Sequence, residues 1–235
     1  MRALSDIDLD VWPGSVLAIC GDNGAGKSSL IKIMSGAQEP SSGSMRLRGH
    51  EVRFRSPHDA LIQGVATIYQ ELALAPRLSI AANVFMGAEL TRSIGVPFVR
   101  VLDHTQMAEQ ARGYLRRLSV DIADMARPVE GLSGGQRQAV AISRALRWNA
   151  GVIIMDEPTA ALGVKETAQV LDLIRHLKAD GRTVILISHS MRDVVALATR
   201  VVIWKGGRLA RDLPMDGLSA DDLSHIIMSA PAEVV

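Results

Sequence analysis

The sequence predicts an α/β fold with a mainly parallel sheet, and three observations support this. Short apolar runs without polar alternation recur along the chain, as expected of strands that are buried on both faces. They lie at 15–20, 64–69, 151–156, 183–188 and 200–204. Segments with helical periodicity separate most of these runs, which is the pattern of a sheet covered by helices. A glycine-rich loop joins the first run to a helical segment.

The clearest helical segments lie at 103–118, 136–146 and 165–181, and Gly181 closes the last of them as a C-terminal glycine would. Near the C-terminus, "WKGGRLA" predicts a β-hairpin and "SADDLSHIIM" predicts a capped helix. We therefore expect a small antiparallel β part in addition to the parallel sheet.

The stretch 71–131 interrupts the alternation of strands and helices and is mostly helix-like. We expect it to form a helical subdomain within an α/β core made of 1–70 and 132–235. At 235 residues the chain is long enough for one sizeable core with such a subdomain.

The composition argues against several classes of protein. A net charge of +1 gives no field that would recruit nucleic acid, and an aromatic content of 3% offers few stacking platforms, so we expect no nucleic-acid partner. The apolar runs are too short to span a bilayer, and the N-terminus shows no signal-peptide pattern. We expect a cytosolic protein that could serve a membrane only by docking to another protein. Cys20, the lone cysteine, is expected to be a buried strand residue.

The glycine-rich loop, "GDNGAGKSS", is predicted to bind phosphate. Glycines lack a Cβ, so backbone N–H groups can converge on an anion, and the N-terminus of the following helix adds the positive end of its dipole. Lys27 supplies a mobile cation and Ser28 a hydroxyl suited to Mg²⁺. The alternative is a tight turn with an incidental lysine, which the strand–loop–helix context disfavours. The predicted site comprises Gly21, Asp22, Asn23, Gly24, Ala25, Gly26, Lys27, Ser28 and Ser29.

Two carboxylates, Asp156 and Glu157, follow the apolar run at 151–156. They lie at the carboxyl end of a predicted strand, where open α/β sheets bind ligands. In P-loop ATPases an aspartate at this point holds the metal, and an adjacent glutamate can orient or deprotonate a water molecule. The alternative is that both residues simply end a strand beside Pro158.

The segment "LSGGQRQAVAISRAL", at 132–146, places a serine and two glycines before a helix. Such a helix N-terminus can bind phosphate, although it could also be a loop followed by an ordinary capped helix. Because the chain already has one phosphate loop, we expect the second to act on the nucleotide of another copy. Two copies in a closed head-to-tail pair would each present this loop across the interface.

Five motifs occur in the order found in ABC-type ATPases: "GDNGAGKSS", the glutamine of "IYQEL", "LSGGQ", "IIMDEP" and the histidine of "LISHS". The resemblance covers most of the chain, from about 4 to 213. It implies a P-loop NTPase core, hydrolysis of ATP with Mg²⁺, and a homodimer. The whole chain, 1–235, would then be one nucleotide-binding domain.

The resemblance also implies a role for each matching residue. Lys27 and the backbone of Gly24 and Gly26 would hold the β- and γ-phosphates, and Ser28, Gln70 and Asp156 would hold the metal. Glu157 would be the catalytic base, with Gln70 sensing the attacking water. His189 would contact the γ-phosphate, although a histidine there could also be an ordinary strand-end residue. The γ-phosphate on the opposite subunit would be capped by Ser133, Gly134, Gly135 and Gln136.

Two longer stretches, "GVATIYQELALAPRLSIAANVFMGAEL" and "DEPTAALGVKET", resemble the ATP-binding subunits of bacterial monosaccharide importers. This implies transmembrane permease subunits as partners, a periplasmic sugar-binding protein as an indirect one, and a peripheral location on the cytoplasmic face of the inner membrane. The main alternative is a soluble ABC ATPase in DNA maintenance or translation. A weaker alternative is a regulatory module that binds ATP without hydrolysing it.

The sequence departs from the family pattern at two points. Gly163 stands where most ABC ATPases have an aspartate that lines the dimer interface. No aromatic residue precedes the first strand at the spacing of the family's adenine-stacking residue, and Trp12 is too near the phosphate loop to replace it. We expect that either the chain is incomplete at its N-terminus or adenine is held differently. Loss of one stacking contact would weaken ATP binding by roughly one to two powers of ten.

Overall fold

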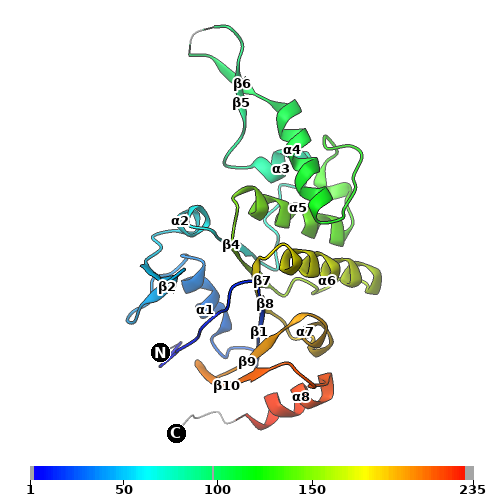
Figure 1. Ribbon diagram of the computed structural model, residues 1–235. Helices are drawn as coiled ribbons and strands as arrows, with labels where there is room; N and C mark the ends of the chain where they lie inside the picture. Colours follow the sequence, from blue (N-terminus) through cyan, green and yellow to red (C-terminus); the bar gives the residue numbers. More distant parts are fainter. Residues whose placement is uncertain (1–2, 97, 231–235) are drawn as a thin grey trace. The chain divides into compact units, whose positions relative to one another are not determined.

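A six-stranded sheet forms the centre of one of the two units into which the chain divides (Figure 1). The computed structural model describes residues 3–96 and 98–230. Among these residues, the first unit takes in those up to Gln70, Ala150–Pro158 and those from Leu177 onward. The second unit takes in Glu71–Asn149 and Thr159–His176.

The sheet consists of β1 (Val16–Gly21), β4 (Val65–Ile68), β7 (Val152–Asp156), β8 (Thr183–Ile187), β9 (Arg200–Lys205) and β10 (Arg208–Pro214). Its strand order is β10-β9-β1-β8-β7-β4, and all neighbours pair in parallel except β10 and β9. Each of the five predicted apolar runs forms a strand, so the predicted parallel sheet is confirmed. The predicted hairpin is β9–β10, and its turn residues Gly206 and Gly207 have φ of +56° and +79°, as a type I′ turn requires.

The remaining elements of the first unit are α1 (Lys27–Met34), β2 (Met45–Leu47), β3 (His50–Val52), α2 (Pro57–Ile62), α7 (Met191–Leu197) and α8 (Ala220–Ser229). The strands β2 and β3 pair as a separate antiparallel hairpin. The predicted helix near the C-terminus is α8, which begins with a capping box between Ser219 and Asp222.

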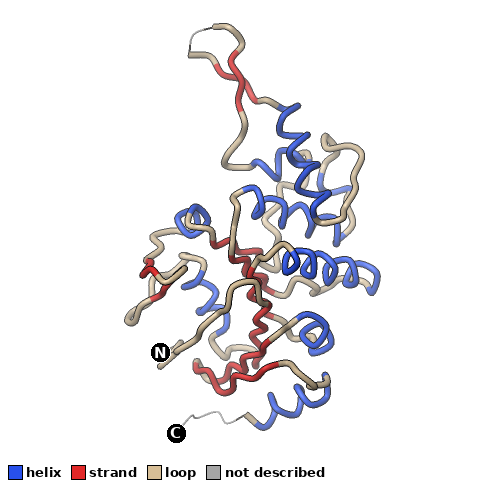
Figure 2. Tube along the Cα trace, in the orientation of Figure 1, coloured by secondary structure: helices blue, strands red, loops and turns tan. Residues whose placement is uncertain are grey.

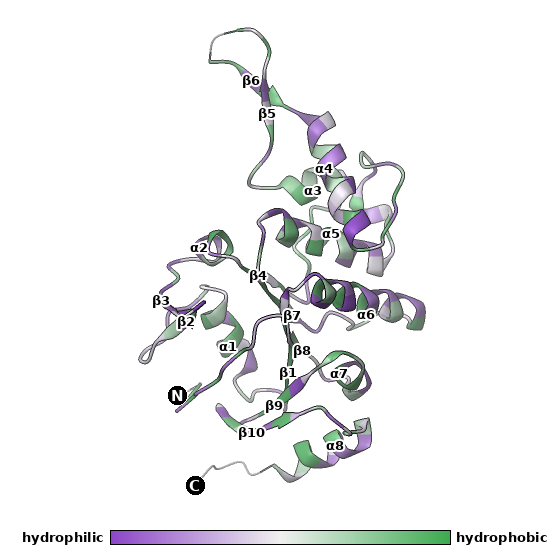
Figure 3. Ribbon diagram, in the orientation of Figure 1, coloured by the Kyte–Doolittle hydropathy of each residue, from purple (hydrophilic) through white to green (hydrophobic). Residues whose placement is uncertain are grey.

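Alternate residues of β1 face two different apolar clusters, which explains why this strand forms a continuous apolar run. Leu17 and Ile19 pack with side chains from α1, whereas Ala18 and Cys20 pack with side chains from α7 and α8. The central strands are accordingly hydrophobic along their length (Figure 3). Cys20 is fully buried, as predicted, and burial raises the pKa of its thiol to about 12.

The second unit is mainly helical (Figure 2). It contains α3 (Ile80–Phe85), β5 (Thr91–Ser93), β6 (Arg100–Leu102), α4 (His104–Arg117), a 3₁₀ turn (Val129–Gly131), α5 (Gly134–Arg147) and most of α6 (Val164–Ala179). Helices α3, α4 and α5 pack against one another. In α4 the buried residues Met107, Ala111 and Leu115 recur every fourth position, as expected of a helix with one apolar face.

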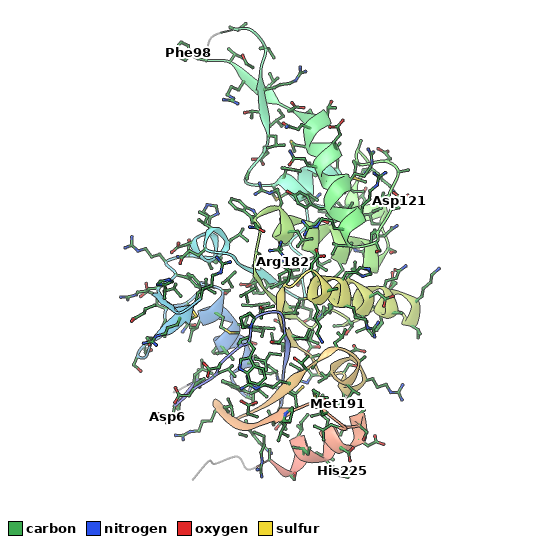
Figure 4. The ribbon with its side chains drawn as sticks, viewed as in Figure 1. Asp6, Phe98, Asp121, Arg182, Met191 and His225 are labelled. Atoms are coloured by element: carbon green, nitrogen blue, oxygen red, sulfur yellow. The ribbon has the colours of Figure 1, made fainter. Side chains whose placement is uncertain are left out.

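This unit differs in two ways from the expected helical stretch 71–131. It also takes in α5 and most of α6, because α5 packs against α3 and α4. It also contains the hairpin β5–β6, where the sequence predicts mainly helix. Arg100 Nε donates a hydrogen bond of 2.8 Å to Thr91 Oγ1 across this hairpin, and Phe98 is fully exposed near its tip (Figure 4).

The C-terminus of α6 confirms the predicted role of Gly181, which has a φ of +74°. Its N–H donates to the carbonyl of Lys178, and the N–H of Arg182 donates to the carbonyl of Leu177. These two bonds define a Schellman motif. In the ranges that the structure describes, no helix is long and apolar enough to cross a bilayer.

Asn83, on α3, organises the segment that follows Gln70. Its side chain is fully buried, and its Oδ1 accepts a 2.7 Å hydrogen bond from the N–H of Ala75. Its Nδ2 lies within donor distance of the carbonyls of Ala75, Leu78 and Ser79. One amide group therefore bonds to the backbone of Ala75, Leu78 and Ser79 in this loop.

We predict that Asn83→Ala lowers the free energy of unfolding by about 2–3 kcal/mol, because it removes a fully buried hydrogen-bonding side chain and leaves the N–H of Ala75 without its acceptor. Urea denaturation followed by circular dichroism measures this change. The matched control, Gln110→Ala on the exposed side of α4, is expected to change stability by less than about 0.5 kcal/mol. Equal stability of Asn83→Ala and the parent protein would contradict this assignment.

Candidate functional site

The parallel register brings the carboxyl ends of four strands to one edge of the first unit. Ile187 of β8 lies between Ile19 of β1 and Asp156 of β7, and Ile68 of β4 pairs with Met155 of β7. The segments that follow these strands carry the predicted phosphate loop, Gln70, Glu157 and His189. All predicted site residues of the first unit therefore lie at or just after the same edge of the sheet, where ligands bind in folds of this kind.

Lys27, the first residue of α1, folds back over the loop that precedes it. Its Nζ donates hydrogen bonds to the carbonyls of Gly21 and Asp22, at 2.6 and 2.8 Å, and the residue is only 8% exposed. Burial lowers the pKa of its ammonium group, and the negative charge of Glu157 opposes this shift. The ammonium group is therefore held next to the first residues of the loop.

Two glycines of the loop have no space for a side chain. A Cβ on Gly21 would lie 2.0 Å from the carbonyl oxygen of Trp204, and a Cβ on Gly26 would lie 2.6 Å from that of Ala3. The β9–β10 turn also contacts the loop, since the N–H of Gly207 donates a hydrogen bond to the carbonyl of Ala25 at 2.8 Å. Close packing of backbone against backbone therefore fixes the path of the loop.

The N–H groups of this loop fit an anion such as a phosphate. Gly26 caps α1 in a left-handed conformation with a φ of +103°, and no side chain of the described residues caps this helix. Within the described ranges, no acceptor pairs with the N–H groups of Asn23, Gly24, Gly26, Lys27 and Ser28. Unpaired donors at the positive end of a helix dipole are the chemistry of a phosphate site.

Asp156 and Glu157 differ in backbone geometry although they are adjacent. Asp156 ends β7, and burial raises the pKa of its carboxyl group, against the opposing charge of Lys27. Glu157 has a φ of +49°, a left-handed conformation that is uncommon for glutamate and typical of functional sites. Its N–H donates to the carbonyl of Ile187 at 2.9 Å, so β8 holds the turn in place.

Glu157 and His189 form a pair. His189 Nε2 lies 3.3 Å from Oε1 of Glu157, and the side chain of Glu157 is 20% exposed. Burial raises the pKa of the Glu157 carboxyl group, and the neighbouring His189 opposes the shift. A carboxylate with a raised pKa is a better proton acceptor at neutral pH than an ordinary surface glutamate.

The oxygen ligands at this edge fit a magnesium ion. Among the described residues, no group of three or more His, Cys, Asp or Glu side chains could hold a metal. Mg²⁺ does not need such a cage, because it usually takes one or two carboxylates together with phosphate oxygens and water. Asp156 supplies a carboxylate, and the Ser28 hydroxyl is exposed at the second position of α1.

Gln70 is exposed and follows β4 after one intervening residue, Tyr69. The hydroxyl of Tyr69 lies 3.2 Å from Oγ of Ser35, at the C-terminal end of α1. The segment that carries Gln70 is thus tied to the helix that begins at the phosphate loop. No pattern in the sequence predicts this link.

The second predicted phosphate site belongs to the second unit. Ser133 caps α5, accepting a hydrogen bond from the N–H of Gln136, and Gln136 Oε1 accepts one from the N–H of Ser133. Gly134 and Gly135 are buried against α6 and the loop that precedes α6. A Cβ on Gly134 would lie 2.4 Å from Leu162 Cδ2, and a Cβ on Gly135 would lie 2.6 Å from Gln169 Oε1. The local structure is therefore a capped helix whose two glycines are needed for close packing.

Sequence reasoning missed Glu166, whose carboxylate accepts hydrogen bonds from Gly134 and Gly163. The available signal was a glutamate three residues after Gly163, the spacing of a capping box. The guanidinium of Arg200 lies over the ring of Trp12, with its Cζ 4.8 Å from the ring centroid. Since Arg200 pairs with Leu17 at the start of β1, Trp12 is at the opposite edge of the sheet from the loop and does not replace an adenine-stacking residue.

Solved structures with this fold include a dimeric ATP-binding cassette in a post-hydrolysis state with ADP and Pi, at 24% identity and a TM-score of 0.74 over 92% of both chains. A nucleotide-free cassette from an ABC transporter gives 24% identity and a TM-score of 0.77, over 97% of this chain and 90% of the other. The fold is that of an ATP-binding cassette. A family described as ABC transporter matches residues 4–160, and the chain belongs to this family.

Among curated relatives, a fructose import ATP-binding protein of Rhizobium meliloti is 49% identical over 88% of this chain and 81% of the relative. A xylose/arabinose import ATP-binding protein of Sulfolobus acidocaldarius is 40% identical over 97% of this chain and 89% of the relative. A ribose import ATP-binding protein of Streptomyces avermitilis is 42% identical over 95% of this chain but only 43% of the relative. The chain thus spans most of two of these relatives and less than half of the third.

We predict that Lys27→Met weakens binding of Mg·ATP at least about tenfold, because it would remove the charge-assisted hydrogen bonds that we expect Lys27 to donate to the phosphates. Isothermal titration calorimetry measures the affinity. Lys32→Met is the matched control, since Lys32 is exposed on the same helix and is expected to leave the affinity unchanged. Unchanged affinity in Lys27→Met would remove Lys27 from the phosphate site.

Proposed function

We propose that the chain is the ATP-hydrolysing subunit of a membrane importer for a monosaccharide. The observation that carries the proposal is the sheet edge at which the Lys27 loop, Asp156 and the Glu157–His189 pair occur together. The relatives are named for the import of fructose, of xylose or arabinose, and of ribose. These names support a monosaccharide as the substrate. The protein would act on the cytoplasmic face of a bacterial inner membrane, as a peripheral subunit.

In this proposal the first unit binds Mg·ATP, which supplies the phosphoryl group and a metal charge that neutralises it. Lys27 would exchange its two carbonyl acceptors for oxygens of the β- and γ-phosphates. Within the loop of residues 21–29, the same phosphates would be held by the unpaired N–H groups of Asn23, Gly24, Gly26, Lys27 and Ser28. Ser28, Gln70 and Asp156 would hold the metal.

Glu157 would take the proton from the attacking water. Its left-handed backbone and its hydrogen bond to Ile187 fix its position, and its raised pKa strengthens it as a base. His189, at 3.3 Å from Glu157, would contact the γ-phosphate while it orients the carboxylate. Gln70 would contact the metal and sense the attacking water.

Each copy supplies only part of the site in this proposal. Ser133, Gly134, Gly135 and Gln136 would cap the γ-phosphate bound to the other copy, so hydrolysis requires a homodimer. The second unit would dock onto the permease subunits, and the closing of the dimer around ATP would move them. A periplasmic sugar-binding protein would deliver the sugar to the permease, without contact with this chain.

We predict that Glu157→Gln binds Mg·ATP as the parent does but hydrolyses it at least about a hundredfold more slowly. The glutamine keeps the shape of the side chain and cannot accept the proton. Turnover is measured by release of inorganic phosphate, and affinity by calorimetry. Glu51→Gln, on an exposed position of β3, is the control for the loss of one carboxylate. Parent-like turnover of Glu157→Gln would exclude Glu157 as the base.

The transport role is tested with tagged Glu157→Gln protein and Mg·ATP in detergent-solubilised membranes of the native host. A polytopic permease that co-elutes only with ATP is the expected result. Uptake of labelled fructose, ribose and xylose by a deletion strain then identifies the sugar. If the protein binds ATP and dimerises but recovers only soluble partners, the importer role is wrong and a soluble ABC ATPase is the better interpretation.

A further inference from the structure

Glu166, in the first turn of α6, joins two loops of the second unit. Its Oε1 accepts a hydrogen bond of 2.7 Å from the N–H of Gly134, the first residue of α5. Its Oε2 accepts one of 3.3 Å from the N–H of Gly163, immediately before α6. One carboxylate therefore lies at the N-termini of two helices, where a negative charge is favourable.

The contact with α5 is close as well as charged. A Cβ on Gly134 would lie 2.4 Å from Leu162 Cδ2 and 3.1 Å from Glu166 Oε1. Gln169 lies three residues further along α6, and its Oε1 would be 2.6 Å from a Cβ on Gly135. Both glycines are therefore held against side chains from α6 and the loop before it, and the start of α5 has little freedom to shift.

Glu166 also determines which donors of the Ser133–Gln136 turn remain available. The N–H of Gly134 is committed to Glu166, and the N–H of Gln136 is committed to Ser133 Oγ. Among the described residues no acceptor pairs with the N–H of Gly135. The Ser133 hydroxyl accepts a bond through its oxygen, so its own proton is still available to donate.

We propose that Glu166 is a positioning residue for the phosphate contact made across the dimer. It holds the Gly134 N–H so that the Ser133 hydroxyl and the Gly135 N–H face the phosphate of the other copy. Through Gly163 it also ties this turn to the loop that follows Glu157 in sequence. This inference rests on the proposed function, because it requires two copies that share a nucleotide.

An experiment distinguishes this role from the opposite one. If the γ-phosphate displaced Glu166 from Gly134, the carboxylate would be a competitor and its removal would strengthen the dimer. A positioning role makes the reverse prediction. Removal of Glu166 would weaken the dimer and leave the binding of ATP to a single copy unchanged, because the phosphate loop belongs to the first unit.

The test uses Glu157→Gln protein as the parent, so that ATP is bound without being hydrolysed. Glu166→Ala removes both acceptors. Glu166→Asp keeps the charge at the helix N-terminus but shortens the side chain by one methylene, which protects folding and withdraws the carboxylate from Gly134. Glu166→Gln keeps one acceptor oxygen at full length. Glu109→Ala, at an exposed position of α4, is the control.

Affinity for Mg·ATP is measured by calorimetry at protein concentrations below the dimer dissociation constant, and that constant is measured by analytical ultracentrifugation. We expect all variants to bind ATP within about twofold of the parent. The dimer dissociation constant should rise at least about tenfold in Glu166→Ala and Glu166→Asp, the effect of one lost hydrogen bond to a charged group. Glu166→Gln should stay within about threefold of the parent, and Glu109→Ala should match it.

Three results would overturn the proposal. The first is a dimer of unchanged or greater strength in Glu166→Ala. The second is equal weakening in Glu166→Gln and Glu166→Ala, which would show that the hydrogen bond to Gly134 is not the cause. The third is a parent that binds Mg·ATP and stays monomeric, which would refute the proposed function itself and the inference with it.

Discussion

The parallel pairing of β1, β8, β7 and β4 is the constraint on which the site of the first unit depends. Parallel strands end at the same edge, so residues that are more than a hundred positions apart in sequence follow neighbouring strands. Burial on both faces of β1 fixes this arrangement, because a shift of one residue would exchange the partners of Leu17 and Ala18. The positions of the site residues at this edge therefore depend on the packing of the core that fixes the strand register.

At that edge, burial and the attraction between opposite charges shift the pKa of each group in opposite directions. Burial lowers the pKa of Lys27 and raises the pKa of Asp156 and Glu157, so it disfavours every charge. The opposite charges favour one another, since Lys27 opposes the shifts of Asp156 and Glu157, and Glu157 opposes the shift of Lys27. The charge of Asp156, by contrast, adds to the rise in the pKa of Glu157. Lys27 thus stabilises the charged form of both carboxylates in a site that is partly removed from water. Loss of any one of the three groups would alter the protonation of the rest.

The parts of the structure that could be predicted are those whose signal is local. Strands buried on both faces give apolar runs, and the Lys27 loop needs glycines at fixed spacing, so both are visible in a few consecutive residues. The hairpin β5–β6 gave no such signal, because its strands have three mostly exposed residues each. The Glu166–Gly134 contact joins residues 32 positions apart and depends on how α6 packs. Such tertiary contacts leave no periodicity in the sequence, and the roles of the individual site residues remain predictions.

The bond from the β9–β10 turn to the phosphate loop has a thermodynamic consequence. A loop of glycines loses much conformational entropy when it becomes ordered around a ligand. Here the N–H of Gly207 already holds the carbonyl of Ala25, and the carbonyl of Gly207 accepts a bond from the N–H of Ser5. Part of that ordering is therefore complete when the chain folds. In the proposed function, the nucleotide therefore meets a preorganised loop, and its affinity would depend on a hairpin that need not touch it.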